Sequence, residues 1–562
     1  MIMTSGDLLA HSNANKHARI TLSVLTAALF IKCVILRYCT GVDDTLSAGQ
    51  TLCAYLSVLA AALTFGMVAW FPKRWPSVLV LVLTDLWFIA LIWYHAANGV
   101  WLNAQAIFSI TELRGFESSI LSYLAWPQLF LPLTTLLAAY ILSIFPSRKP
   151  ATNRRVLVTN IVLIVSLSIF AAVGRTFLPQ SEENKMRSFL AEKNFYIATH
   201  SPLAHLLMIG KEAVQDGLLR WNAKRPFSER EKTILAEIHR PEQMPAEPQG
   251  HLVYILVESW ESWTLETEDR FGQAICPYLN AYINSRPRLY VKEVETQQVY
   301  GRSGDGQLIT QTGLLPLSSG IACRQFGENT YPNLAHFYKS GAVLNPYFVP
   351  VWNQTVVTGS YGFERLISPR RFRNWNDSLL MVEAQRFLTH ATAPTAALIL
   401  TIDTHTPFRT KQDTASLDER FTEVEKDYLR SVRYTDRQIG AFLQWADTAA
   451  VMQNATFVIT ADHNHFERRD GKGFCPFILV SPCISQPVNY SNALQMDIFP
   501  TVLHAIGQSN YAWRGFGVDL LDTSASYLLQ HRPISVQEAY RLSDKLIRSN
   551  YFSPLVSTKD LL

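Results

Sequence analysis

Long apolar runs near the N-terminus constrain the fold of this chain more than any other feature. Five such runs lie in the first 175 residues, and each approaches or exceeds the roughly 20 residues that a helix needs to cross a bilayer. A buried helical core is the alternative, but five uncapped runs of this length disfavour it. The sequence therefore predicts a transmembrane domain over residues 1–175, with five helices at 20–39, 52–71, 77–96, 120–145 and 156–173.

Basic residues between these runs indicate how the chain is oriented. Lys16 and Arg19 precede the first run, Lys73 and Arg74 follow the second, and the loop at 148–155 carries four more basic residues. The other loops are mainly acidic, so the positive-inside rule places the N-terminus in the cytoplasm. Five crossings then put everything after residue 173 outside a bacterial cytoplasmic (inner) membrane, in the periplasm or the extracellular space.

Two charges lie within the predicted membrane helices. Lys32 is in the first run and Asp85 in the third, at depths that differ by about one or two helical turns. A buried ion pair would lower the cost of both charges. Alternatively, Lys32 extends to the interface and Asp85 faces a wet cavity. The sequence leaves both arrangements open.

Composition excludes several functional classes. A net charge of +4 over 562 residues, with the basic residues of the first part in membrane-flanking clusters, argues against a nucleic-acid partner. Four of the seven cysteines follow residue 175, which permits disulfides without assigning them. Because no cysteines form a C-x-x-C motif, a zinc finger and a thioredoxin-type site are unsupported. The four cysteines are Cys276, Cys323, Cys475 and Cys483.

Changes in composition divide the rest of the chain into three parts. Residues 176–250 form a polar, helix-prone juxtamembrane connector that ends in a proline-rich segment. Residues 251–525 have the mixed composition of a globular domain. Residues 526–562 are predicted to form a C-terminal helical tail.

Three apolar runs of strand length in the globular part change abruptly into chemically active residues. They cover 251–260, 396–408 and 455–466, and continuous apolar runs of this kind are typical of strands buried on both faces of an α/β sheet. Ligands of open α/β sheets bind beyond the carboxyl ends of the strands, so these ends should meet at one crevice. The residues at the ends are Glu258, Asp403, His405, Asp462, His463 and His465.

Three of these residues have the chemistry of a metal site. Glu258, Asp462 and His463 combine oxygen and nitrogen ligands without a thiolate, which favours Mn²⁺ or Zn²⁺. Three ligands leave a fourth position on zinc for a nucleophile or substrate. Ser303, in the Gly-Arg-Ser-Gly-Asp-Gly turn at 301–306, would fill it, because metal coordination is one of the few ways to activate a serine hydroxyl.

Short motifs across 251–525 resemble those of the alkaline phosphatase/sulfatase superfamily. Together with five N-terminal spans, they are similar to its lipoteichoic acid synthase branch, the membrane phosphoglycerol and phosphoethanolamine transferases. The resemblance implies an exported, sulfatase-like α/β domain with a central, mostly parallel sheet. In family order, the motifs are V-E-S-W at 257–260, G-R-S-G-D-G at 301–306, T-G-L-L-P-L at 312–317, V-W-N-Q at 351–354, H-T-P-F at 405–408, Y-T-D at 434–436, T-A-D-H at 460–463 and M-D-I-F-P-T at 496–501.

The resemblance also implies roles for particular residues. Glu258, Asp462 and His463 would bind one divalent ion, with Ser303 as both nucleophile and fourth ligand. His405 would hold the phosphoryl group or stabilise the leaving oxygen.

The neighbouring positions allow two interpretations each. Arg302 could neutralise phosphate charge or be a solvated turn residue, and Asp305 shapes the turn in preference to acting as a base. Trp352, with Asn353 beside it, could contact a head-group or anchor its own loop. Asp403 and His465 are candidates for a second metal but fit better as supporting or loop residues.

The implied reaction uses a membrane phospholipid, phosphatidylglycerol or phosphatidylethanolamine, as donor. Ser303 would displace diacylglycerol and pass the phospho-head-group to an envelope glycan, lipid or polymer. In lipoteichoic acid synthases a basic residue follows the Trp-Asn pair and a histidine precedes the tryptophan by seven positions. Here these positions hold Gln354 and Asn345, which weakens the case for glycerol-phosphate polymerisation and leaves the head-group open.

Other functions explain the sequence less well. A sulfatase of this fold would carry a Cys/Ser-x-Pro-x-Arg motif, which the segment after Ser303 lacks. A free phosphatase would need a second metal and more ligands, and the sequence offers no convincing second set. A phosphodiesterase of the same fold is the alternative that stays open. A binding-only domain would be expected to have lost a ligand or the nucleophile, and a transporter would leave the large exported domain unexplained.

Overall fold

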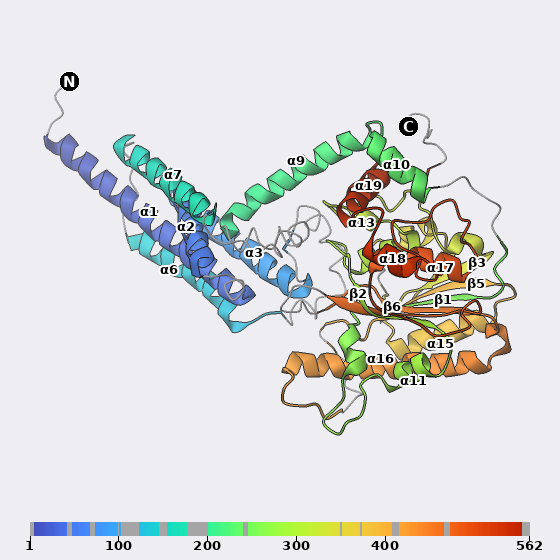
Figure 1. The fold of residues 1–562 in the computed structure, drawn as a ribbon. Helices are drawn as coiled ribbons and strands as arrows, with labels where there is room; N and C mark the ends of the chain where they lie inside the picture. The colour runs from blue at the N-terminus through green and yellow to red at the C-terminus, as the bar shows by residue number, and fades with distance from the viewer. Residues whose placement is uncertain are drawn as a thin grey trace. The chain divides into compact units, whose positions relative to one another are not determined.

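Figure 1 shows the chain in a computed structural model. The chain forms two compact units, and the division falls within helix α9, between Ala213 and Val214. The structure describes residues 5–41, 48–67, 73–98, 101–102, 123–144, 154–176, 201–239, 246–348, 351–370, 374–406, 408, 415–465 and 473–553.

The N-terminal unit is helical, and each of the five predicted runs contains an apolar helix. Three helical stretches, Ile20–Thr40, Trp75–Ala96 and Trp126–Ile144, are long and apolar enough to cross a membrane. The apolar parts of the other two, Thr51–Gly66 and Val158–Ala171, are shorter within the described residues. The helices are α1 (Ser5–Thr40), α2 (Ala48–Gly66), α3 (Trp75–Asn98), η4 (Trp126–Leu129), α6 (Phe130–Ile144), α7 (Arg154–Thr176) and η5 (Pro202–Ala204).

Lys32 and Asp85 form the buried ion pair that the sequence left open. Lys32 on α1 has no exposed surface and contacts the carboxylate of Asp85 on α3. Its ammonium also donates to the Leu131 carbonyl at 2.6 Å and to the Thr135 hydroxyl at 2.8 Å, both on α6. Thr135 in turn donates to Asp85. The pair thus links three helices, and neither charge faces a wet cavity or the interface.

The C-terminal unit contains one eight-stranded sheet in the order β4-β3-β5-β1-β6-β7-β2-β8. The prediction of a mostly parallel sheet is confirmed: β6–β7 and β7–β2 are its antiparallel pairs. The strands are β1 (Leu252–Val257), β2 (Leu289–Glu295), β3 (Ser340–Leu344), β4 (Arg365–Ile367), β5 (Thr395–Leu400), β6 (Thr456–Ala461), β7 (Phe474–Val480) and β8 (Val488–Leu494).

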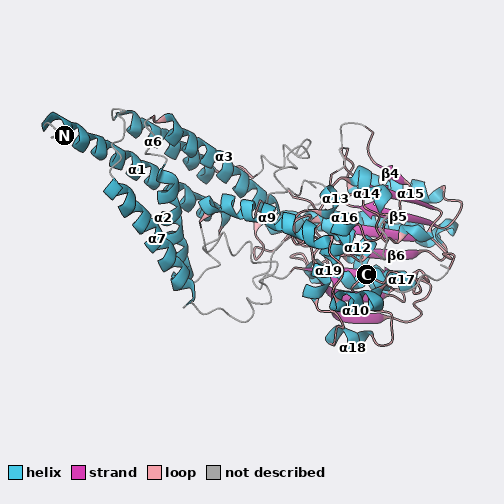
Figure 2. Cartoon of the chain, turned by 90° about the horizontal axis from the view of Figure 1, so that it is seen from above, coloured by secondary structure: helices cyan, strands magenta, loops and turns pink. Residues whose placement is uncertain are grey.

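Strand β1 shows why its sequence is continuously apolar. It pairs in parallel with β5 on one side and β6 on the other, and all six of its residues are buried. Leu252, Tyr254 and Leu256 belong to one hydrophobic cluster, and the intervening residues belong to a second. Both faces of the sheet are therefore covered by helices. Figure 1 shows helices above and below the strands, and Figure 2 shows the strands, in magenta, from above.

Helices α12, α17 and α19 contribute to the first cluster, and α11, α15 and α16 to the second. Capping boxes start α10, α16 and α19. The helices of this part are α9 (His205–Ala223), α10 (Glu229–Ile238), η6 (Ser262–Glu266), α11 (Pro277–Asn284), α12 (Ser303–Thr312), α13 (Ala322–Gln325), η7 (Ala335–Phe337), α14 (Gln354–Ser360), α15 (Asp377–Thr389), α16 (Glu423–Thr448), η8 (Ala450–Met452), η9 (Gln495–Asp497), α17 (Ile498–Ala505), α18 (Ala525–Gln530) and α19 (Val536–Ser549).

The C-terminal helix and the cysteines complete the description of the fold. Helix α19, in the segment expected to be a tail, buries Tyr540, Leu546 and Ile547 in the same core as the sheet. All seven cysteines are free thiols, so none of the disulfides that the sequence permitted is formed.

Candidate metal centre

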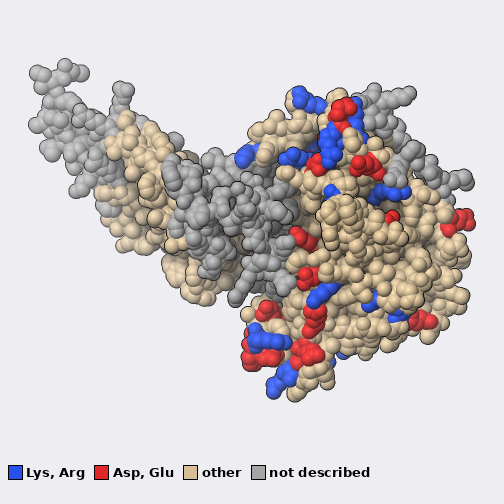
Figure 3. All heavy atoms as spheres, viewed as in Figure 1, with Lys and Arg blue, Asp and Glu red and all other residues tan. Residues whose placement is uncertain are grey.

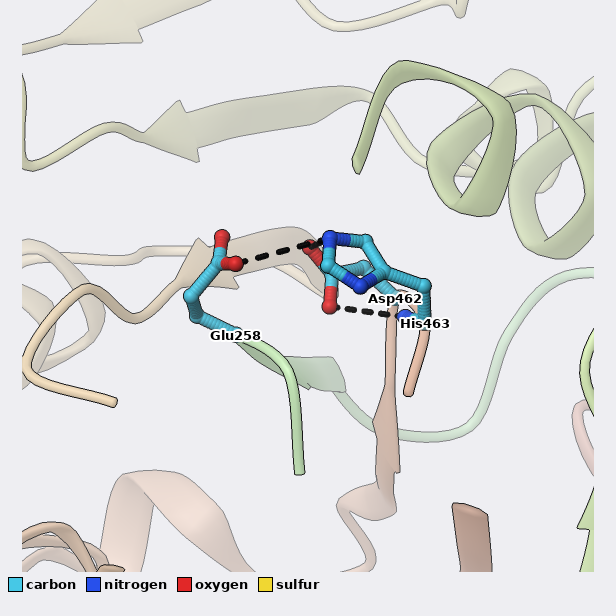
Figure 4. A group of neighbouring side chains, drawn as sticks. All are labelled: Glu258, Asp462 and His463. Atoms are coloured by element: carbon cyan, nitrogen blue, oxygen red, sulfur yellow. Dashed lines mark hydrogen bonds and ion pairs between the residues drawn. The ribbon is translucent and has the colours of Figure 1, made fainter. Parts of the chain in front are cut away.

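The carboxyl ends of β1 and β6 bring together the three residues predicted to bind a metal. Val257 and Ala461 are register partners at the ends of these parallel strands, so the residues that follow them are neighbours. Glu258, Asp462 and His463 each offer a ligand atom within 4.8 Å of the others (Figure 4). His463 Nε2 lies 3.5 Å from Glu258 Oε1 and 3.6 Å from Asp462 Oδ2.

The electrostatics of this group fit a divalent cation. Burial, followed by the nearby Asp462 carboxylate, raises the pKa of Glu258 well above its usual value. Burial lowers the pKa of His463 to about 4, so its imidazole is neutral at neutral pH. Because its Nδ1–H donates to the Asn464 carbonyl at 2.8 Å, Nε2 carries the lone pair that faces the carboxylates. Two buried carboxylates and one imidazole lone pair are a suitable donor set for Mn²⁺ or Zn²⁺.

Hydroxyl and amide groups around the carboxylates hold them in place. The Ser259 amide donates to Asp462 Oδ1 at 2.8 Å, and its hydroxyl donates to Glu258 Oε1 at 2.7 Å. Ser259 has a positive φ of 50°, a strained conformation for a residue other than glycine. The Glu258 amide donates to Thr401 Oγ1 at 2.9 Å. Sequence reasoning missed Ser259 and Thr401, and the available signal was a hydroxyl residue at the end of each strand.

Ser303 lies beside this group as the first residue of α12. Its Oγ is 3.2 Å from Glu258 Oε2 and 3.3 Å from His463 Nε2. Gly306 allows this close approach, because a Cβ at that position would lie 2.2 Å from the Asp462 carbonyl oxygen. Arg302, which precedes the serine, is half-buried with a positive φ of 42°. The glycine-rich turn therefore brings the hydroxyl to the carboxylates, as the sequence predicted.

Asp305 shapes this turn. Its carboxylate accepts hydrogen bonds from the amides of Val299 and Gly301, both at 2.8 Å. It is almost fully buried, and burial raises its pKa to about 6. These backbone contacts agree with the expectation that Asp305 organises the loop.

His405 follows β5 and belongs to the same electrostatic environment. Its Nδ1–H donates to the Thr406 carbonyl at 2.6 Å, which leaves Nε2 as the other polar atom of the ring. Burial lowers its pKa, and the charges of Asp462 and Arg302 act on it in opposite directions. Of the site residues, Asp462 and Arg302 therefore interact electrostatically with His405.

Asp403 and His465, the candidates for a second metal, make other contacts. Asp403 Oδ2 accepts the Asp377 amide at 2.6 Å. The His465 ring packs against Phe408 and Tyr428, with ring centroids 5.0 and 5.9 Å away. Within the described part of the chain, neither residue belongs to a group that could hold a metal.

Trp352 lies next to helix α12, which begins with Ser303. An added Cβ at Gly304 would lie 3.4 Å from its ring, and the Arg324 guanidinium is 4.7 Å above that ring. Asn353 turns inward, with its side-chain amide donating to the Cys323 carbonyl at 2.9 Å. Arg324 is a basic residue near Trp352 that the sequence motifs did not indicate.

Asn345 and Gln354, at the two positions where the resemblance implied cation-capable residues, are buried amides. Asn345 donates to the Tyr347 carbonyl at 3.0 Å, and Gln354 donates to the Thr358 hydroxyl at 3.3 Å. Both side chains are about 1% exposed. The two positions therefore support the loop from inside.

The sheet, with the acidic site at its carboxyl edge, forms an α/β domain, and part of this domain matches a known family. The Sulfatase family matches residues 314–508, a segment that includes His405, Asp462 and His463. Glu258 and Ser303 precede the matched segment in the sequence, and in the structure they lie beside Asp462 and His463.

The chain is similar in sequence to lipoteichoic acid synthases. It is 22% identical over 305 residues to lipoteichoic acid synthase 1 of Bacillus subtilis (strain 168), a match that covers 48% of each protein. It is 22% identical over 363 residues to lipoteichoic acid synthase of Staphylococcus aureus (strain USA300), covering 57% of this chain and 55% of that protein. The chain thus spans about half the length of the curated relatives it matches. The resemblance inferred from the motifs is confirmed.

One solved structure resembles both parts of the chain. The integral membrane protein lipooligosaccharide phosphoethanolamine transferase A (EptA) of Neisseria meningitidis superposes with a TM-score of 0.52 at 12% identity. The match covers 90% of this chain and 99% of that one. At this identity the likeness shows the fold alone, which is an apolar helical part followed by a sulfatase-like domain.

Proposed function

We propose that this protein is a metal-dependent transferase that moves a phospho-head-group from a membrane phospholipid to an acceptor in the cell envelope. The head-group is glycerol phosphate or ethanolamine phosphate, and the acceptor is a glycan, lipid or polymer. The observation that carries the proposal is the position of Ser303 Oγ, 3.2 Å from Glu258 Oε2 and 3.3 Å from His463 Nε2. A serine hydroxyl at a buried pair of carboxylates has the arrangement of an activated nucleophile.

One divalent ion, Mn²⁺ or Zn²⁺, would be held by Glu258, Asp462, His463 and Ser303. When bound, it would favour the deprotonated serine and offset negative charge on the phosphoryl oxygens. The chain prepares this site in advance, because Ser259 fixes both carboxylates and Asn464 fixes the imidazole. Arg302 and the N-terminus of α12 add positive charge where an anionic phosphoryl group would bind.

The transfer occurs in two balanced steps. Ser303 Oγ attacks the phosphorus of the lipid, the bond from phosphorus to the diacylglycerol oxygen breaks, and that oxygen ends with the serine proton. An acceptor hydroxyl then attacks the phosphorus of the seryl phosphodiester, and Ser303 recovers a proton from the acceptor. His405 would hold the phosphoryl group or stabilise the leaving oxygen, and its electrostatic interaction with Asp462 and Arg302 supports this role.

A membrane location supports this choice of donor. The proposal includes five membrane crossings, a cytoplasmic N-terminus and a C-terminal unit outside a bacterial cytoplasmic membrane. The three helices with span-like length and composition, and the basic loop clusters, support it. Attachment to the bilayer would give the catalytic unit a high effective concentration of phospholipid.

Mass spectrometry of the full chain tests the proposal. The detergent-solubilised protein is incubated with Mn²⁺ or Zn²⁺ and with phosphatidylglycerol or phosphatidylethanolamine, beside Ser303→Ala. Ser491→Ala is a matched control, because Ser491 is exposed on β8. We expect a phospho-head-group adduct on the Ser303 peptide of the wild type and the control, with a mass that names the head-group.

Two outcomes would contradict the transferase. Absence of an adduct with either lipid, while the metal is bound, would remove the covalent step. Rapid release of free head-group phosphate without an acceptor would identify a hydrolase with the same site, such as a phosphodiesterase.

A further inference from the structure

The second half of helix α9 exposes a stripe of large apolar side chains. Val214, Leu218 and Trp221 are 66%, 54% and 56% exposed. Their spacing of four and three residues places them on one face of the helix. Three adjacent exposed side chains of this size form an apolar patch of the kind that marks an interaction site.

The opposite face of α9 is fixed to the C-terminal unit. Asp216 is buried and accepts from Arg548 Nη1 at 2.6 Å and from Arg220 Nε at 2.7 Å. Arg548 has no exposed side-chain surface and also bonds Asp544 on α19 at 2.7 Å. Ala223, two residues after the last residue of the stripe, is buried. The helix therefore cannot rotate its apolar face into the unit without breaking a buried ion-pair network.

Basic residues accompany the stripe. Lys224 and Arg225 directly follow the helix and are exposed, and the Arg225 guanidinium lies 4.0 Å above the Trp221 ring. The acidic Asp216 is neutralised by its two arginine partners. In Figure 3, blue, red and tan atoms all lie around the end of α9 that meets the C-terminal unit, so the basic character comes from Lys224 and Arg225 themselves. An aromatic and apolar face beside lysine and arginine is typical of helices that lie in a membrane interface.

The first turn of the same helix is attached to an apolar helix of the N-terminal unit. His205 donates from Nε2 to the Leu102 carbonyl at 2.6 Å, and its ring stacks on Trp87 of α3 at 5.9 Å. Leu102 follows the carboxyl end of α3. The amino end of α3 directly follows Lys73 and Arg74. If those basic residues are cytoplasmic, α9 starts at the outer surface of the bilayer.

We infer that Val214, Leu218 and Trp221 dock onto the outer leaflet, with Lys224 and Arg225 contacting anionic phospholipid head-groups. The inference rests on the membrane location within the proposed function and is independent of the chemistry at Ser303. Apolar side chains contribute through burial at the boundary of the acyl chains, and each basic residue near an anionic surface adds to binding.

Fluorescence quenching in vesicles tests this surface. The full chain, with Cys483→Ser to remove its exposed thiol, carries Leu218→Cys labelled with an environment-sensitive fluorophore. The vesicles contain phosphatidylglycerol and phosphatidylcholine, with nitroxide groups on the lipids at shallow or deep positions. Gln215→Cys, exposed on the same helix beside the stripe, is the matched control. We expect blue-shifted emission and strong shallow quenching at position 218, and weaker effects at 215.

The charge contribution is tested with Lys224→Glu/Arg225→Glu and with vesicles of phosphatidylcholine alone. Each change should reduce quenching at 218. A blue shift without lipid quenching would mean that protein covers the stripe, from this chain or a second copy, and would overturn the inference. An unshifted probe, exposed to water, would also overturn it. Quenching at position 218 should persist in Ser303→Ala. A failure of the docking inference can therefore be distinguished from a failure of the proposed catalysis.

Discussion

Two buried clusters of ionisable side chains, one in each unit of this protein, are compensated in opposite ways. The N-terminal unit buries a cation against an anion, and Lys32 makes all of its described contacts with Asp85, Leu131 and Thr135. The C-terminal unit buries two anions, Glu258 and Asp462, beside a neutral imidazole. The first cluster is neutral without any addition. The second has excess negative charge that a cation from solution would neutralise.

This difference separates structural charges from binding charges. A buried group is costly unless it is paired, so a cluster that satisfies itself links elements of the fold. A cluster of like charges is tolerated where something else supplies the opposite charge. The pKa of Glu258 is raised because burial and Asp462 both disfavour its ionised form. A bound cation would favour that form.

The largest effect should come from breaking the self-neutralised pair. Lys32→Met leaves Asp85 buried without its cation, and we expect a loss of about 3–5 kcal/mol from the stability of the helical unit. Thermal unfolding of the detergent-solubilised chain, followed by circular dichroism, measures it. Lys32→Met/Asp85→Asn should recover most of the loss, because it removes both charges. A double variant as unstable as the single one would show that the pair is not self-contained.

The acidic pair should behave in the reverse way. Asp462→Asn keeps an oxygen that can accept from the Ser259 and His463 amides but removes a buried like charge. Without metal, its unfolding temperature should equal or exceed that of the wild type. At a Mn²⁺ concentration 100 times its Kd, the wild type should gain about 2.7 kcal/mol, and the variant should gain almost none. Glu364→Gln, an exposed carboxylate, is the control. Equal Mn²⁺ stabilisation of the variant would contradict the metal site.

The close approach of α12 to the acidic pair should depend on the absence of a side chain at Gly306. Gly306→Ala places a methyl group against the Asp462 carbonyl, so we expect a loss of about 1–3 kcal/mol and a strong decrease in head-group transfer. Gly359→Ala on α14 is the matched control, because no atom lies within 4 Å of its added Cβ. There, alanine should raise stability by about 0.5–1 kcal/mol. Full activity of Gly306→Ala would mean that the helix can shift without moving Ser303.

The smallest effect concerns a third arrangement, in which a proton compensates the charge. Burial and the adjacent Asp403 raise the pKa of Asp377 from 3.8 to about 7. The folded state then holds a proton that the unfolded chain releases near pH 4, so the free energy of unfolding falls as pH rises from about 4 to about 7. This one group contributes at most about 1.4 kcal/mol per pH unit to the slope. Asp377→Asn should remove that contribution from the difference between unfolding curves at pH 5 and pH 7, whereas Asp427→Asn, at an exposed site, should leave the difference unchanged. An unchanged slope in Asp377→Asn would assign the pH dependence to other groups.

Much of the candidate metal site could be predicted, because the ends of buried strands can be recognised in a sequence. A strand buried on both faces is continuously apolar, so the first carboxylate or imidazole after it marks the carboxyl edge of the sheet. Glu258 and Asp462 were found in this way, and the register of β1 and β6 brings them together. The glycines around Ser303 were an equally local signal.

Contacts between distant segments could not be predicted in the same way. Ser259 holds both carboxylates, and Asp377 meets Asp403, through pairings that no local pattern specifies. The same is true of Arg548, which fixes α9 from a segment expected to form a tail. A single residue's neighbours across the fold depend on which elements pack together, and hydrophobic periodicity does not encode that choice.

Local sequence thus settled which segments are apolar helices, which are buried strands and which residues could bind a metal. These properties depend on burial and spacing within one segment. Whether a buried charge is compensated depended on packing between segments. The sequence left the partner of Lys32 open, and the packing of α1, α3 and α6 pairs it with Asp85. The acidic pair gains a hydroxyl group only because α12 packs with Ser303 beside it. The physical reason is that electrostatic interactions in a protein interior act over a few ångströms in space, regardless of separation along the chain.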